Sequence, residues 1–76
     1  MNQEEFGEWL SKERKRKQPF TNLTKFATRA EISKSQLSRF ESGKFDYLTD
    51  VMILRLSKAY EIPITEIINA CKDFKY

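Results

Sequence analysis

The sequence lacks histidine altogether and has only one cysteine, two glycines and two prolines among its 76 residues. It therefore lacks the side chain that most often serves as a general base or metal ligand. No cluster of Asp, Glu and Cys has the spacing of a metal site, and no glycine-rich loop is present that could hold a phosphate. Cys71, with no histidine to activate it, is a poor nucleophile and is better explained as a small buried or interface residue. We expect no enzymatic activity, no cofactor and no metal.

Long apolar runs are missing as well. No stretch approaches the ~18 apolar residues that a membrane span requires. The N-terminus is acidic, whereas a secretion signal would be basic and then apolar. With a single cysteine the chain cannot form an intrachain disulfide. Proteins without disulfides are typical of a reducing compartment. These features predict one small domain, residues 1–76, that is cytoplasmic and makes no membrane contact.

The net charge of +3 is unevenly distributed along the chain. Residues 1–11 contain three acids and no bases, residues 12–45 contain ten bases and three acids, and residues 46–76 contain four bases and five acids. The basic excess lies in the middle segment, where it could attract a phosphate backbone through counterion release. A solvated charged surface explains the same distribution equally well, so charge alone leaves both interpretations open.

Apolar residues recur at helical spacing, and helix-breaking residues are scarce. The pattern predicts five helices: residues 4–17, 23–30, 34–42, a fourth between a Thr49 cap and a break at 61–63, and 64–72. Gln18 and Pro19 should end the first helix, and the tail at 73–76 is expected to fray. In the last helix we expect Ile64, Ile67, Ile68 and Cys71 to be buried. The expected fold is all-α, a compact arrangement of five helices.

The run KERKRK at residues 12–17 ends the first helix, whose start carries Glu4, Glu5 and Glu8. Acids at the beginning and bases at the end of a helix both suit its macrodipole, which gives the run a structural role. Nuclear targeting or a nucleic-acid-binding arm is the alternative interpretation.

The stretch from 22 to 43 predicts two short helices joined by a tight turn. Asn22 and Ser33 are good N-caps for the two helices, and Gly43 stands where a left-handed residue closes a helix. The second helix buries its apolar side chains and leaves a polar, partly basic face. That face consists of Lys34, Ser35, Gln36, Ser38 and Arg39.

From about residue 6 to residue 68, the chain resembles the Cro/CI-type repressor family, with its lambda-repressor-like helix-turn-helix fold. The residues that carry the resemblance are Phe6, Gly7, Leu10 and Arg14 in the first helix, Phe26, Ala27, Ile32, Ser33, Leu37, Ser38, Arg39, Glu41 and Gly43 in the helix-turn-helix, and Leu56, Ala59, Tyr60 and Ile62 in the fourth helix and its exit. Each piece alone is a weak signal, whereas the set in one order is a strong one.

The resemblance implies that the helix at 34–42 lies in the major groove of double-stranded DNA. It assigns base contacts to Lys34, Ser35, Gln36 and Arg39, and phosphate contacts to Asn22, Ser33, Ser42, Gly43, Lys44 and Arg14. Arginine can bind guanine, and glutamine adenine, through two parallel hydrogen bonds. A surface ion pair is the alternative role for Arg39, and Ser35 and Gln36 could equally be ordinary surface residues. The resemblance also implies a structural ion pair between Arg14 and Glu41, which places Glu41 in the scaffold.

The chain departs from the family pattern at three points. Glu31 stands where the family usually has glycine in the turn, and a non-glycine residue held left-handed costs on the order of 1 kcal/mol. Leu23 replaces a glutamine that helps to position the recognition helix in the family. The connection between Arg14 and Asn22 is about two residues longer than in compact phage repressors.

Two functional hypotheses follow. The first is a sequence-specific DNA-binding transcriptional regulator, acting as a repressor and as a homodimer, in a bacterial or phage setting and with a regulatory protein as a possible partner. Its dimer surface could include the surplus apolar residues of the fourth helix, the fifth helix and the tail, although these could equally be core and a loose end. They are Val51, Met52, Leu54, Ile68, Cys71, Phe74 and Tyr76. The second hypothesis is a protein-interaction module with the same fold, which would dock through Trp9, Phe45, Tyr47 and the aromatic residues of the tail.

Overall fold

The computed structural model describes residues 1–17 and 22–74, and these contain five α-helices. The helices are α1 (Gln3–Lys17), α2 (Leu23–Ala30), α3 (Lys34–Ser42), α4 (Asp50–Tyr60) and α5 (Ile64–Ala70). The predicted all-α fold is confirmed, with α1 beginning one residue early and α5 ending two residues early. The helix end expected at Gln18 and Pro19 lies outside the described residues. None of the described helices is long and apolar enough to cross a membrane.

Side-chain caps fix the start of the three middle helices. A side-chain oxygen of Asn22, Ser33 and Thr49 accepts a hydrogen bond from the backbone N–H three residues further on, at 2.8, 3.1 and 3.3 Å respectively. Each of these bonds satisfies a donor that the first turn of a helix leaves without an intrahelical partner. The three caps predicted from the sequence are therefore present.

Left-handed residues close α2, α3 and α4. Gly43 closes α3 at φ 76°, whereas Glu31 and Glu61 close α2 and α4 at φ 58° and φ 55°. The turn between α2 and α3 thus keeps the geometry that usually requires glycine, in spite of the glutamate. A hydrogen bond from Arg55 Nη1 to the carbonyl oxygen of Glu31, at 3.3 Å, helps to hold this turn.

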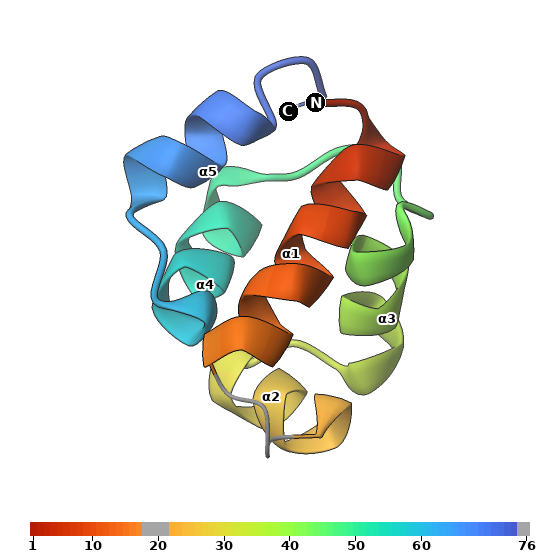
Figure 1. The fold of residues 1–76 in the computed structure, drawn as a ribbon, viewed down its shortest axis with the longest axis vertical. Coiled ribbons are helices and arrows are strands. Elements are labelled where there is room, and N and C mark those ends of the chain that lie inside the picture. Colours follow the sequence, from red (N-terminus) through yellow and green to blue (C-terminus); the bar gives the residue numbers. More distant parts are fainter. Residues whose placement is uncertain (18–21, 75–76) are drawn as a thin grey trace.

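Helix α1 crosses the middle of the molecule and packs against both α3 and α4 (Figure 1). Helix α2 lies below them and contacts α3 and α4, while α5 packs on α4. The core fills the space between these elements with side chains from all five helices, among them Phe6, Phe26, Leu37, Leu56 and Ile67.

An aromatic cluster joins the N-terminal half of α1 to the end of the chain. The ring centroid of Phe74 lies 5.3 Å from that of Phe6 and 5.4 Å from that of Phe45. The carbonyl oxygen of Phe74 also accepts a hydrogen bond from the Leu48 N–H at 3.3 Å. The prediction of a frayed tail is therefore wrong for Phe74, which is only 9% exposed. Burial of a large aromatic ring outweighs the loss of chain entropy at this position. Residues 75 and 76 lie outside the described part of the chain.

The last helix buries a narrower face than its sequence suggested. Ile67 and Cys71 are buried and Ile68 is half-buried, but Ile64 is 39% exposed. Ile64 is the first residue of α5, directly after Pro63, so it lies at the rim of the contact with α4. The prediction that Ile64 is buried is wrong.

Gly7 allows α1 and α3 to approach closely. A Cβ atom built at this position would lie 2.6 Å from the carbonyl oxygen of Glu41 and 2.7 Å from that of Phe40. Both contacts are with backbone atoms, which cannot rotate away. The crossing of α1 over the end of α3 therefore requires glycine at position 7.

We predict that Gly7→Ala destabilises the protein by about 1–3 kcal/mol, because the added methyl group forces α1 and α3 apart. At an exposed helical position the same change would stabilise by about 1 kcal/mol, so the sign of the effect is diagnostic. Urea unfolding followed by circular dichroism measures it, with Lys15→Ala on the exposed side of α1 as the control. A Gly7→Ala variant as stable as the wild type would contradict the close packing.

A second prediction concerns the turn. Glu31→Gly should be about 0.5–1 kcal/mol more stable than Glu31→Ala, because relief of the left-handed strain exceeds the extra entropy of glycine in the unfolded state. Both variants lose the same carboxylate, so their difference in free energy of unfolding isolates the backbone effect. Equal stability of the two variants would mean that position 31 leaves the left-handed region.

Candidate nucleic-acid interface

Helix α3 presents one polar face to solvent. Leu37 and Phe40 are fully buried and fix the rotation of the helix about its axis. As a result, Lys34, Ser35 and Arg39 are exposed and Gln36 is half-buried. The structure thus brings the four residues predicted to read bases onto one accessible helix.

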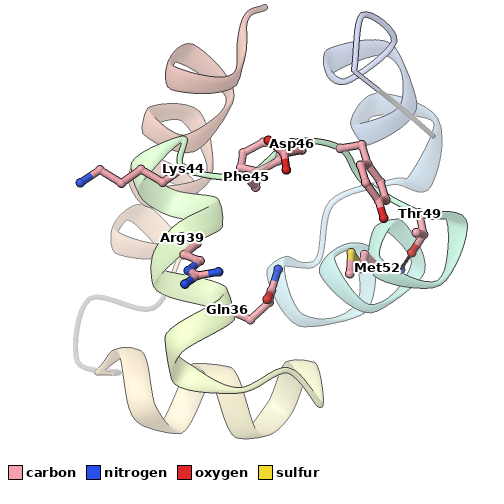
Figure 2. A pocket seen from close by; sticks show the side chains of 8 residues that line it. Gln36, Arg39, Lys44, Phe45, Asp46, Thr49 and Met52 are labelled. Atoms are coloured by element: carbon pink, nitrogen blue, oxygen red, sulfur yellow. Dashed lines mark hydrogen bonds between the residues drawn. The ribbon is translucent and has the colours of Figure 1, made fainter.

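A hollow of about 280 Å³ lies beside this face, between α3 and the segment that leads into α4 (Figure 2). Gln36 and Arg39 extend into it from α3, and the opposite side is formed by Phe45, Asp46, Tyr47, Thr49 and Met52. Sequence reasoning missed most of this second wall, because a loop without periodicity gives no signal about which helix it faces. Asp46 places a carboxylate next to the basic residues, which limits how uniformly the hollow can attract phosphate.

The residues predicted to contact phosphates are more varied in their surroundings. Lys44 is exposed, and Figure 2 shows its ammonium group extending outward from the end of α3. Asn22 and Ser33 are exposed caps, with an amide N–H₂ and a hydroxyl proton still able to donate. The Ser42 hydroxyl instead donates to the Ser38 carbonyl oxygen at 2.8 Å, and the Gly43 N–H donates to the Phe40 carbonyl oxygen at 3.3 Å.

The carboxylate of Glu41 connects three helices. Arg14 Nε and Nη2 of α1 donate to its two oxygens at 2.8 and 2.9 Å, and the Tyr60 hydroxyl of α4 donates to Oε2 at 2.5 Å. The side chains of Arg14 and Glu41 are 12% and 9% exposed, so the pair is largely shielded from water. The pair that the resemblance implied is therefore present, with Tyr60 as a third member that sequence reasoning did not place there.

The pKa values of this cluster follow from its contacts. The hydrogen bond to Glu41 raises the pKa of Arg14. Burial, and then the hydrogen bond to Glu41, raise the pKa of the Tyr60 hydroxyl far above its usual value. Both groups therefore keep their protons throughout the physiological range.

The basic run at 12–17 is partly used inside the fold. Lys17 Nζ donates to the carbonyl oxygens of Tyr60 and Glu61, at 3.1 and 2.8 Å, and so binds the C-terminal end of α4. Arg16 pairs with Glu13 one turn away. For these two residues the structural interpretation of the run fits the contacts.

Leu23 departs from the family pattern without leaving a defect. Its side chain is half-buried and packs against the core, where a glutamine would have remained polar.

No group of three or more His, Cys, Asp or Glu residues in the described part of the chain is arranged to hold a metal ion. The accessible chemistry of α3 is that of hydrogen-bond donors and positive charge.

Two helices joined by a tight turn, with the second held rigidly and polar on its outer face, define a helix-turn-helix DNA-binding domain. A family model described as the Cro/C1-type HTH DNA-binding domain matches residues 11–73. The chain belongs to this family, and its fold and family membership make it a DNA-binding regulator. No curated protein matches the chain. No solved structure matches it either.

We predict that Tyr60→Phe lowers the free energy of unfolding by about 1.5–3 kcal/mol at neutral pH, because a buried hydrogen bond to a charged group is lost. Tyr47→Phe is the matched control, since Tyr47 is 48% exposed. Urea unfolding of both variants measures the effect. If both substitutions lowered the free energy of unfolding by the same amount, the prediction that the hydrogen bond from Tyr60 to Glu41 stabilises the fold would be contradicted.

The same bond predicts a pH dependence. Below about pH 10 both the folded and the unfolded state hold the tyrosine proton, so its contribution to stability is complete. Above that pH the unfolded state loses the proton first, because the folded-state pKa is raised, and stability falls by up to about 1.4 kcal/mol per pH unit. The difference between wild type and Tyr60→Phe should therefore shrink above about pH 10. A difference that stays constant into the alkaline range would show that Tyr60 ionises normally in the folded protein.

Proposed function

We propose that the protein is a transcriptional regulator that reads specific sequences in double-stranded DNA with α3 lying in the major groove. The observation that carries this proposal is the placement of Lys34, Ser35, Gln36 and Arg39 on one accessible helix whose opposite side is buried. Arg39 is suited to guanine and Gln36 to adenine, because each side chain can form two parallel hydrogen bonds with that base. Lys34 and Ser35 open the helix, at the end that approaches the bases first.

Phosphate contacts set the register of the complex without reading sequence. We assign them first to Lys44, Asn22 and Ser33, whose donors are accessible. Ser42 and Gly43 contribute through the shape of the end of α3, since their donors are engaged within the fold. Arg14 acts mainly by fixing Glu41, because two of its nitrogens are already bound.

We further propose that the protein acts as a homodimer and as a repressor in the cytoplasm. One recognition helix contacts only a few base pairs, and a two-fold dimer doubles the length of DNA that is read. A small protein bound at a promoter can block transcription by occupying the DNA, with no further contact required. Of the dimer surface suggested by the sequence, Cys71 and Phe74 are buried in the core, whereas Val51 and Leu54 of α4 are exposed.

The alternative function, a protein-interaction module, receives less support. Its proposed aromatic docking patch included Phe45 and Phe74, which pack against each other and against Phe6 with ring centroids 5.3 to 6.0 Å apart. Trp9 is half-buried against the same cluster. Of the described members of that patch, Tyr47 is the one that is largely exposed.

The test starts with selection of bound duplexes from a random pool, followed by affinity measurements on the enriched sequence and on an unrelated duplex. We predict that Arg39→Ala weakens binding to the enriched sequence by about 1–3 kcal/mol and changes the affinity for the unrelated duplex far less. Lys44→Ala should lower the affinity for both duplexes by the same factor and reduce the slope of log affinity against log salt concentration by about 1. Circular dichroism confirms that both variants fold.

Two outcomes would overturn the proposal. One is a selection that enriches no sequence, with wild-type binding that disappears at moderate salt. The other is an Arg39→Ala variant that behaves like Lys44→Ala on both duplexes, because Arg39 would then contribute charge without reading bases.

A further inference from the structure

The hollow beside α3 contains a carboxylate that the fold does not use. Among the described residues that line this hollow, Asp46 is the only acid. Its side chain is exposed, and within residues 1–17 and 22–74 no hydrogen bond or ion pair engages its carboxylate. Figure 2 shows Asp46 on the segment that connects α3 to α4, across the hollow from Gln36 and Arg39. A free acceptor therefore stands beside two side chains that the proposed function assigns to bases.

The segment that carries Asp46 is anchored on both sides. Before it, the Lys44 N–H donates to the Arg39 carbonyl oxygen at 2.9 Å, and Phe45 packs against the aromatic rings of the core at centroid distances of 5.4 to 6.0 Å. After it, Leu48 is fully buried. The fold thus sets the place of Asp46 relative to α3, as a side chain that reads bases requires.

A carboxylate at this place is unsuited to the DNA backbone. Phosphate oxygens are negatively charged acceptors, and an ionised carboxylate only accepts hydrogen bonds. A group that enters the hollow next to Asp46 must therefore bring a donor. In the major groove, the donors on the base edges are the exocyclic amino groups of cytosine and adenine.

Of these two bases, cytosine is the better partner for a carboxylate. Its own major-groove edge presents the N4 amino group alone, whereas adenine presents the acceptor N7 beside its amino group. Thymine has the acceptor O4 where cytosine has the amino group, and guanine presents two acceptors. Asp46 would therefore attract cytosine and repel thymine and guanine, and such repulsion of the wrong partner adds to specificity.

We infer that Asp46 accepts a hydrogen bond from the N4 amino group of a cytosine and so selects cytosine at one position of the bound sequence. This position lies close to the bases contacted from α3, because Asp46 shares its hollow with Gln36 and Arg39. The inference rests on the proposed function and adds to it a specificity-determining residue outside the recognition helix.

Selection from a random duplex pool, repeated with variants of the full chain, tests the inference. At one position where the wild type selects cytosine, Asp46→Ala should retain no preference. Replacing that cytosine by thymine should lower the affinity of the wild type about 5- to 100-fold, and that of Asp46→Ala far less. Asp46→Asn, which keeps the shape and removes the charge, should admit adenine there, because an amide can bond to both N6 and N7.

Glu66→Ala is the matched control for the loss of one negative charge. Glu66 is exposed and belongs to α5, away from the residues that line the hollow. This variant should keep the preference of the wild type for cytosine. The Asp46 variants should fold, since the side chain is exposed and unengaged in the described structure, and circular dichroism verifies this.

A change of single atoms gives the sharper test. The selected cytosine is replaced by 2-pyrimidinone, which lacks the N4 amino group, and both duplexes are titrated with the wild type and with Asp46→Ala. The wild type should lose about 5- to 30-fold in affinity, and Asp46→Ala should bind the two duplexes nearly alike. Effects of the analogue on the duplex itself are common to both proteins, so the difference isolates the contact between Asp46 and the amino group.

Three results would overturn the inference. The first is an Asp46→Ala variant that binds every duplex more tightly by one factor and keeps the preferences of the wild type, because Asp46 would then only repel phosphate. The second is an equal loss on the 2-pyrimidinone duplex for both proteins. In either case a position that Arg39→Ala relaxes would leave the proposed function standing. The third is a wild type that selects no sequence, which would overturn the proposed function as well.

Discussion

The hydrogen-bonded carboxylate of Glu41 is the constraint on which the rest of the structure depends. It stands near the end of the recognition helix and is bound from one side by Arg14 of α1 and from the other by Tyr60 of α4. A largely buried carboxylate is costly unless its charge is compensated and its oxygens are hydrogen-bonded. Because both conditions are met only when the three helices take their observed positions, this cluster selects one orientation of α3. The close crossing at Gly7, directly over the backbone of Glu41, makes the same selection by steric means.

The aromatic residues complete this support at the same end of α3. Phe40 packs edge-on against Phe45 at 5.4 Å, and Phe45 contacts Phe6 and Phe74. The Ser33 cap fixes the opposite end of the helix. Nearly all stabilising contacts of α3 are therefore made by its inner side and its ends, which leaves the outer side chains of Lys34, Ser35 and Arg39 without a structural task.

Local features of the fold could be predicted from the sequence, whereas features that depend on distant residues could not. Helix positions and the caps at Asn22, Ser33 and Thr49 follow from side chains within a few residues, so the sequence states them directly. The burial of Phe74 depends on contacts with Phe6 and Phe45, far away in the chain, and a short aromatic tail carries no periodicity from which to infer it. The hydrogen bond from Tyr60 to Glu41 joins residues 19 positions apart in the chain and depends on how α3 and α4 are placed relative to each other, which no local pattern states. For the candidate interface, the sequence predicted the polar face of α3, which is accessible in the structure, but not that the loop at residues 45–47 lies opposite it.

The distribution of charge shows how far the basic segment can serve DNA binding. Residues 12–45 carry ten bases, which taken alone would suggest a strongly electrostatic interaction with phosphate. Yet Arg14, Arg16 and Lys17 are engaged within the fold, and Asp46 adds a carboxylate to the hollow beside α3. On α3 and directly after it, Lys34, Arg39 and Lys44 are exposed. With so few cations, the proposed complex would have a modest salt dependence. Phosphate contacts carry no sequence information, so under the proposed function the discrimination between sequences would come chiefly from the side chains of α3.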